Sequence, residues 1–157
     1  MKSGLRVVPP IEGVTIEKLR QIEDERGAVL HMLRRDASDF TRFGEVYFSE
    51  ILPGAVKAWK QHTKQTQNVA VPVGRIRVVL FDGRVSSTSV SGVTVVELGR
   101  PDAYERIRIP PGVWYGFECL GDTPALIANC CDIPHDPKEA NRCPVDDPHI
   151  PYSWSEQ

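Results

Sequence analysis

The segment AVKAWKQHTKQTQN, residues 55–68, lies between two glycines and spaces its polar side chains like a metal-binding or catalytic loop. It contains Lys60, His62 and Gln67. A histidine has a reference pKa of about 6.5, so it can take or give a proton near neutral pH. A lysine, with a reference pKa of about 10.4, is a cation that can hold negative charge. The segment therefore points to proton transfer beside an anion.

Further candidates for this chemistry lie in the second half of the chain. Removal of a proton next to a ketone needs a base with a pKa near the working pH and a group that holds the enolate charge. His135 is a second candidate acid or base, and Tyr115 and Asn129 are suited to orient a keto oxygen. Trp114, beside Tyr115, is a candidate for lining a pocket.

These residues fall on a chain in which strand signals dominate. Short runs rich in β-branched and aromatic residues alternate with Gly, Pro and Asp, which predicts an antiparallel sandwich or barrel. The predicted strands are 26–35, 45–53, 68–74, 75–84, 93–99, 105–112, 113–121 and 125–131. The segment TIEKLRQIEDE, residues 15–25, has a Thr cap followed by a Glu at 17 and apolar residues at threefold spacing, which predicts one short helix.

The strand pattern also says how the candidate residues are oriented. Lys60 and His62 are two residues apart and should share one face of a strand, because successive side chains alternate. Lys57 would face the other way unless a bulge intervenes. The tail after residue 133 is rich in Pro and Asp, so we expect irregular chain wrapping over the barrel.

Composition excludes several classes of protein. The chain has 157 residues, which suits one domain, and 19 Lys and Arg against 21 Asp and Glu leave no basic bias for nucleic acid. No apolar run approaches the roughly 18 residues of a membrane span, and the first residues lack the apolar stretch of a signal peptide. We therefore expect a cytoplasmic protein that binds neither nucleic acid nor membrane.

The four cysteines do not indicate a metal or disulfide framework. Cys130 and Cys131 are adjacent, which would strain a bridge, and no CxxC pair is present. Small buried side chains in a reducing compartment are the expected role. We expect neither a metal nor another cofactor.

Several segments, in order, resemble the dTDP-4-dehydrorhamnose 3,5-epimerase family of the cupin superfamily over roughly residues 20–155. The segments that carry the resemblance are DERG, 24–27, GAVKAWK, 54–60, FDGR, 81–84, PPGVWYGFECLGD, 110–122, and DDPHIPYSW, 146–154. The resemblance implies an all-β cupin jelly-roll barrel, with the short helix N-terminal to it. We expect one domain, 1–157, with a barrel core at about 28–133 and a C-terminal wrap at 134–157.

The resemblance also implies which positions face the sugar. The family's base histidine falls on Lys60, and its aspartate partner falls on Asp147. The histidine of the second cupin motif falls on Tyr115, and the two family tyrosines fall on Asn129 and His135. Only His62 remains of the usual cupin metal ligands, so we expect a divergent, metal-independent member that lacks the usual catalytic His and Tyr.

The same comparison implies an anion site. A phosphate-binding arginine falls on Arg26, an arginine near the base falls on Lys57, and a lysine near the barrel glycine falls on Gln67. If Asp147 pairs with Lys60, the ion pair favours the charged ammonium, and Lys60 is then a clamp for an enolate or diphosphate instead of a base. Family members are dimers, so we expect a homodimer in which Arg26 completes the partner's pocket.

Three functions follow from these observations. The first is an epimerase or isomerase acting on a 4-keto-6-deoxyhexose nucleotide in deoxysugar or polysaccharide biosynthesis, with a 3,4-ketoisomerase as a close variant suggested by His62 and Gln67. The second is a non-catalytic protein that binds a sugar nucleotide. The third, a metal-dependent cupin, is disfavoured because several ligand positions lack His or carboxylate side chains.

Overall fold

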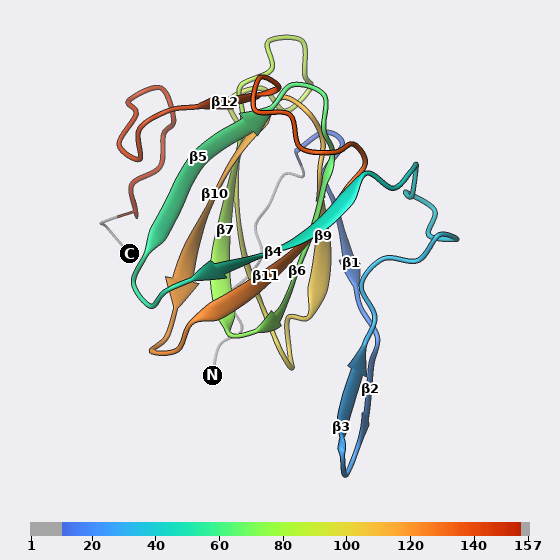
Figure 1. Ribbon diagram of the computed structural model, residues 1–157. Helices are drawn as coiled ribbons and strands as arrows, with labels where there is room; N and C mark the ends of the chain where they lie inside the picture. The colour runs from blue at the N-terminus through green and yellow to red at the C-terminus, as the bar shows by residue number, and fades with distance from the viewer. Residues whose placement is uncertain (1–10, 155–157) are drawn as a thin grey trace.

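The computed structural model describes residues 11–154 and is built of strands, as predicted (Figure 1). The strands are β1 (Thr15–Lys18), β2 (Gln21–Asp24), β3 (Gly27–Leu30), β4 (Glu45–Ile51), β5 (Val56–His62), β6 (Gln67–Val73), β7 (Arg75–Asp82), β8 (Val93–Gly99), β9 (Glu105–Ile109), β10 (Val113–Leu120), β11 (Ala125–Cys131) and β12 (Ala140–Arg142). The ends of the predicted domain, 1–10 and 155–157, lie outside the described residues. In residues 11–154, no helix is both long and apolar enough to cross a bilayer.

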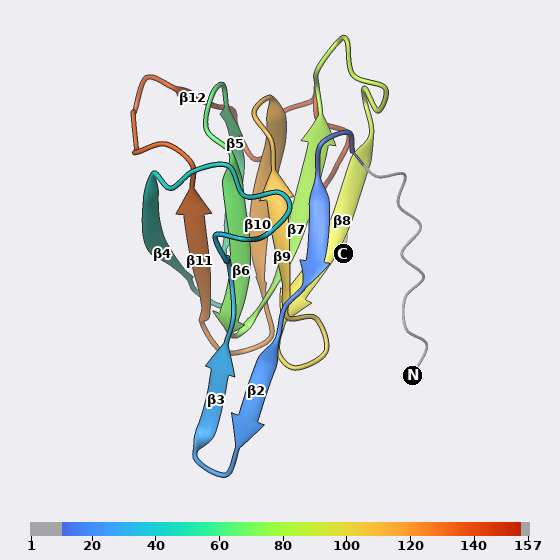
Figure 2. The same ribbon diagram turned by 90° about the vertical axis from the view of Figure 1, so that its right-hand side faces the viewer.

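Two antiparallel five-stranded sheets face one another and form the jelly-roll barrel that the sequence predicts (Figures 1 and 2). One sheet has the order β1-β9-β6-β11-β4, and the other has the order β12-β5-β10-β7-β8. The sheets thus include β1 and β12, which come from either side of the predicted core at 28–133. Alternation along the strands places apolar side chains between the sheets, where each fully buried Val, Leu or Ile contributes about 1.5–3 kcal/mol.

The predicted helix at 15–25 is wrong. Residues 15–18 form β1, in which Ile16 lies opposite Ile107 of β9, and residues 21–24 form β2. The Thr15 hydroxyl donates to Asp39 at 3.0 Å and caps no helix. Helix propensity is a weak prior, and here pairing with an existing sheet edge overrides it. The hairpin β2-β3 extends beyond the barrel, as Figures 1 and 2 show.

A bulge in β5 decides which of its side chains face the barrel interior. Lys60 lies opposite Tyr115 of β10, whereas Lys57 lies opposite Phe117, so three steps along β5 match two along β10. An extra residue of this kind reverses the face of the sheet to which the following side chains of the strand point. Lys57 and Lys60 consequently both line the interior, although a regular strand would turn them to opposite faces.

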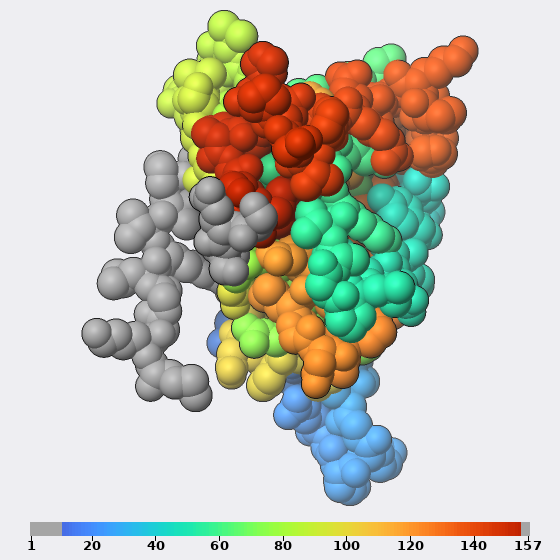
Figure 3. Space-filling view, turned by 90° about the vertical axis from the view of Figure 1, so that its left-hand side faces the viewer, coloured from blue at the N-terminus to red at the C-terminus, as the bar shows by residue number. Residues whose placement is uncertain are grey.

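The C-terminal segment packs on the outer face of the β5-β10-β7 sheet (Figure 3). Ile150 and Trp154 are buried against Trp59 and Val79, and the Trp59 indole donates to the Val145 carbonyl at 3.1 Å. Trp114 joins this outer cluster. The wrap therefore supports the outside of the strands whose inner faces carry Lys60 and Tyr115.

Candidate active site

A cavity of about 560 Å³ opens between the two sheets and contains both basic and phenolic side chains. Its lining comprises Tyr47, Ser49, Val56, Lys57, Ala58, Trp59, Lys60, Tyr115, Phe117, Ile127, Asn129, Arg142 and Cys143. One wall is formed by β5, β10 and β12, and the other is formed by β4 and β11. Four predicted site residues, Lys57, Lys60, Tyr115 and Asn129, are among those that line it.

His62 is buried between the sheets beside Tyr115 and is not among the residues that line the cavity. Its side chain is 5% exposed, its Nε2 is 2.9 Å from the Tyr115 hydroxyl and its Nδ1 is 2.5 Å from Glu139 Oε1. Burial lowers the pKa of His62, against the opposing effect of Glu139. Within residues 11–154, His62, which we expected to act as an acid or base, is thus linked to the cavity through its bond to Tyr115.

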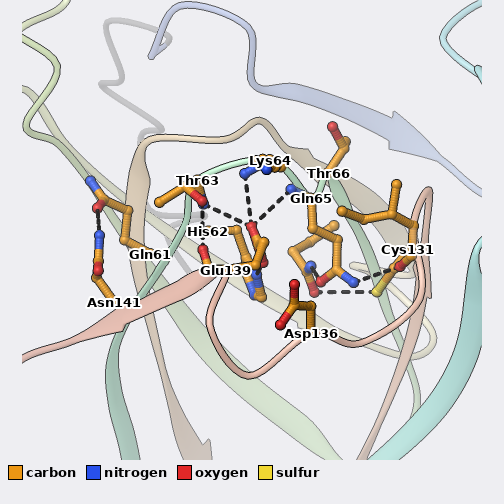
Figure 4. Close-up of polar contacts among 12 residues, drawn as sticks. Gln61, His62, Thr63, Lys64, Gln65, Thr66, Cys131, Asp136, Glu139 and Asn141 are labelled. Atoms are coloured by element: carbon orange, nitrogen blue, oxygen red, sulfur yellow. Dashed lines mark hydrogen bonds and ion pairs between the residues drawn. The ribbon is translucent and has the colours of Figure 1, made fainter.

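The Glu139 carboxylate is held in its ionised form. Oε2 accepts the backbone N–H groups of Thr63 and Lys64, both at 2.8 Å, and of Gln65 at 3.0 Å (Figure 4). Burial opposes ionisation, but the bonds to His62 and these amides outweigh it and lower the pKa of Glu139 to about 2.

The ionised Glu139 fixes the hydrogens of its neighbours. A carboxylate only accepts, so His62 Nδ1 must carry the proton that bonds to it. Because the lowered pKa keeps His62 neutral, its Nε2 has no hydrogen and accepts the hydroxyl hydrogen of Tyr115. The Tyr115 hydrogen thus points away from the cavity, and burial raises the pKa of this phenol well above its usual value.

Lys60 is half-buried in the cavity wall, and the predicted ion pair with Asp147 is not present. The Asp147 carboxylate instead accepts the backbone N–H of His149 at 2.9 Å and lies 3.0 Å from that residue's Nδ1. No carboxylate of residues 11–154 forms an ion pair with Lys60. Burial and the nearby charge of Arg142 lower the pKa of Lys60, the reverse of the expectation based on pairing.

The opposite wall carries a second polar network, which begins at Asn129. Its Nδ2 donates to the Tyr47 hydroxyl at 2.8 Å and also to Gln67 Oε1. Gln67 was predicted to bind substrate, but it is 1% exposed, bonds to Gln65 and Asn129, and is not among the residues that line the cavity. Burial raises the pKa of Tyr47 to about 12, so this phenol remains protonated at neutral pH.

Four other predicted site residues lie outside the cavity. Asp147 lies on a turn of the tail, and Trp114 points to the opposite face of β10 from Tyr115 and packs in the outer cluster. His135 is exposed on the loop between β11 and β12. Arg26 lies at the end of the β2-β3 hairpin, exposed and paired with Asp24 at 2.6 Å.

Comparison with known proteins agrees with this architecture. The model of the dTDP-4-dehydrorhamnose 3,5-epimerase family matches residues 9–157. The chain belongs to this family. It is 33% identical over 147 residues to the spore coat polysaccharide biosynthesis protein SpsL of Bacillus subtilis, covering 92% of this chain and 97% of SpsL. It is 32% identical over 152 residues to the probable low-salt glycan biosynthesis epimerase Agl13 of Haloferax volcanii, covering 94% and 97%.

Solved structures place this family member among related barrels. The dTDP sugar isomerase of Desulfovibrio desulfuricans G20 is 57% identical, with a TM-score of 0.92 and 94% of each chain covered. The 4-keto-6-deoxy sugar epimerase NovW of Streptomyces spheroides shares the fold at 22% identity, with a TM-score of 0.81 and coverage of 92% of this chain and 76% of NovW. The predicted family and barrel are confirmed.

Three residues of the site in this family member, Tyr47, Glu139 and Arg142, were not predicted from the sequence. Tyr47 could have been found, because alternation in EVYFSEI puts it on the same face as Ser49 and the buried Ile51. Glu139 and Arg142 gave no such signal. They reach the site only because β12 pairs with β5, with Arg142 opposite Lys60.

Proposed function

We propose that the protein is a nucleotide-sugar epimerase or isomerase that removes a proton next to the keto group of a 4-keto-6-deoxyhexose nucleotide, without a metal ion. The observation that carries the proposal is Lys60, an amine inside the cavity with no carboxylate partner among residues 11–154 and a lowered pKa. Family membership and the names of the relatives support the substrate class.

Lys60 is a better base than the Tyr115–His62–Glu139 unit beside it. That unit has the order of a Ser-His-Asp triad, with a phenol in place of the serine. Its use as a base would require a phenolate and an imidazolium, and burial disfavours both, because it raises the pKa of Tyr115 and lowers that of His62. Burial moves the pKa of Lys60 towards the working range instead.

The negative charges of the substrate would be held by Lys57 and Arg142. Both line the cavity, and Lys57 bridges the two walls by donating to the Ser49 hydroxyl at 3.0 Å and the Glu50 carbonyl at 2.6 Å. An ammonium and a guanidinium are suited to an enolate oxygen or a diphosphate. Structural neighbours of the same fold bind dTDP and dTDP-quinovose, which supports this ligand class.

The test is solvent exchange. Incubation with dTDP-4-keto-6-deoxyglucose in heavy water should place deuterium next to the keto group, as measured by NMR, and Lys60→Arg should abolish this exchange. Arginine keeps the positive charge but is not deprotonated, so loss of exchange separates a base from a clamp. A non-catalytic binder would show no exchange with the wild-type protein, and product stereochemistry would distinguish epimerisation from 3,4-ketoisomerisation.

We also propose a homodimer, supported by an apolar outer face on β4. Val46 and Phe48 are 48% and 64% exposed, although each lies opposite an apolar residue of β11. The β2-β3 hairpin, which carries Arg26 at its end, extends beyond the barrel (Figure 2), and this supports a role for Arg26 in the cavity of a second copy rather than its own. A second subunit would cover the exposed apolar residues and bring Arg26 to the partner's anion site.

A further inference from the structure

Two phenols face the cavity from opposite walls, and their hydrogens are disposed differently. Tyr115, on β10, donates its hydroxyl hydrogen to His62, which is buried between the sheets. Tyr47, on β4, is 36% exposed and accepts a hydrogen from Asn129. A phenol can donate its hydrogen to a molecule in the cavity only where that hydrogen is not already bonded within the protein.

The direction of the hydrogen bonds at Tyr47 is set by a backbone carbonyl. Gln65 Nε2 donates to the Ile133 carbonyl at 2.7 Å, and a carbonyl can only accept, so Gln65 presents its Oε1 to Gln67 Nε2. Gln67 in turn presents Oε1 to Asn129 Nδ2, and the same NH₂ group donates to the Tyr47 oxygen. These three side chains, Gln65, Gln67 and Asn129, form an amide ladder in which the positions of the oxygen and the NH₂ group of each amide are fixed.

The ladder leaves the Tyr47 hydrogen free for the cavity. Its oxygen accepts from Asn129 at 2.8 Å, whereas among residues 11–154 its own hydrogen has only a 3.5 Å contact to Gln67 Oε1. That distance is too long for a good O–H···O bond. The matching hydrogen of Tyr115 is engaged at 2.9 Å. Of the two phenols, Tyr47 is thus the available proton donor.

We propose that Tyr47 is the catalytic acid, which returns a proton to the carbon on the face opposite to Lys60, and that Gln65, Gln67 and Asn129 position it. This rests on the proposed function. Lys60 Nζ takes the proton as the C–H bond breaks, and the electron pair forms the enolate. The Tyr47 O–H then breaks as a C–H bond forms on the other face, and the ketone is restored. Solvent reprotonates the phenolate and deprotonates the ammonium, so the carbon is inverted without any change of oxidation state.

The experiment compares deuterium exchange with inversion for dTDP-4-keto-6-deoxyglucose in heavy water. For Tyr47→Phe, inversion should fall at least about 100-fold, while exchange stays within about fivefold because Lys60 returns deuterium to the face it came from. The matched control is Tyr152→Phe, which removes the same hydroxyl from the outer cluster and should leave both rates unchanged.

A second variant tests the hydrogen-bond direction while keeping the phenol. Asn129→Asp replaces the donor by a carboxylate that accepts the Tyr47 hydrogen, so inversion should again fall more than exchange. Equal inversion by Tyr47→Phe and wild type, or an equal loss of inversion and exchange, would overturn the role of Tyr47. Exchange without inversion in the wild type would also overturn it. A wild-type protein with no exchange at all would contradict the proposed function itself.

Discussion

The two walls of the cavity use similar polar side chains to opposite effect. On the β5-β10 wall, the ionised Glu139 orders His62, and His62 binds the hydrogen of Tyr115. On the β4-β11 wall, the ladder that ends at Asn129 donates to the oxygen of Tyr47. The hydrogen on the first phenol is thus held inside the protein, and that on the second is free. The position of a tyrosine in a cavity does not by itself define its role, because the bonds behind it decide whether it donates or accepts.

The largest effect should follow from removal of the base on the first wall. Lys60→Met keeps the length of the side chain without its amine, and we expect a loss of about 10³-fold in deuterium exchange, within the range for a general base. Lys60→His should restore part of the rate, with the rising limb of the pH profile moved towards the histidine range near 6.5. Equal pH profiles for Lys60→His and wild type would contradict the assignment of Lys60 as the base.

The next largest effect concerns the stability of the fold in acid, which should depend on Glu139 of the β5-β10 wall. The folded pKa of Glu139, about 2, is below its ordinary value of 4.5. The unfolded chain therefore binds more protons in acid, and the stabilisation is complete above pH 4.5 and lost as the pH falls to about 2. The lowered pKa of His62 acts in the same direction below 6.5.

Glu139→Gln should lower the free energy of unfolding at neutral pH by about 3 kcal/mol, the equivalent of the Glu139 pKa shift. It should also flatten the loss of stability on the acid side, which urea unfolding at several pH values would measure. Asp136→Asn, an exposed change in the same loop, is the control. Unchanged acid sensitivity in Glu139→Gln would contradict the proposed protonation states.

A smaller effect is expected from Tyr115→Phe. The change leaves the Nε2 of buried His62 without its donor, and we expect a loss of about 1–3 kcal/mol in stability. The ratio of inversion to exchange should nevertheless match that of the wild type, in contrast to Tyr47→Phe. A fall in this ratio, measured by NMR in heavy water, would show that the two phenols do not differ as their hydrogen bonds indicate.

Phe48→Asp, on the outer face of β4, should have the smallest effect on the stability of the individual subunit. The side chain is 64% exposed, so the fold should tolerate the change, whereas a dimer across this face should dissociate because it would bury a charge. Sedimentation velocity would show the shift to monomer. Val85→Asp, the same kind of change at a 92% exposed apolar position between β7 and β8, should leave the assembly intact.

The sequence predicted the barrel well because alternation and turn residues mark short strands, and it predicted that Lys60 and His62 share a face. The prediction was wrong at 15–25, where local helix signals were overridden by pairing with β9.

At the site, Lys60, Tyr115 and Asn129 were predicted from their positions in the motifs. Their hydrogen-bonding partners could not be predicted, because the partners are distant in the chain. Glu139 lies 77 residues from His62, and Tyr47 lies 82 residues from Asn129. Asp147 was misplaced because its carboxylate bonds within its own turn.

The order in which Lys60 and Tyr47 lose their protons tests the contrast between the walls most directly. An NMR titration of protein labelled with ¹³C at Lys Cε and Tyr Cζ would follow both groups together, with Lys60→Met and Tyr47→Phe to assign the signals. We predict that Lys60 titrates below its ordinary 10.5, whereas Tyr47 remains protonated until about pH 12. Ionisation of Tyr47 at a lower pH than Lys60 would contradict the assignment of base and acid to these walls.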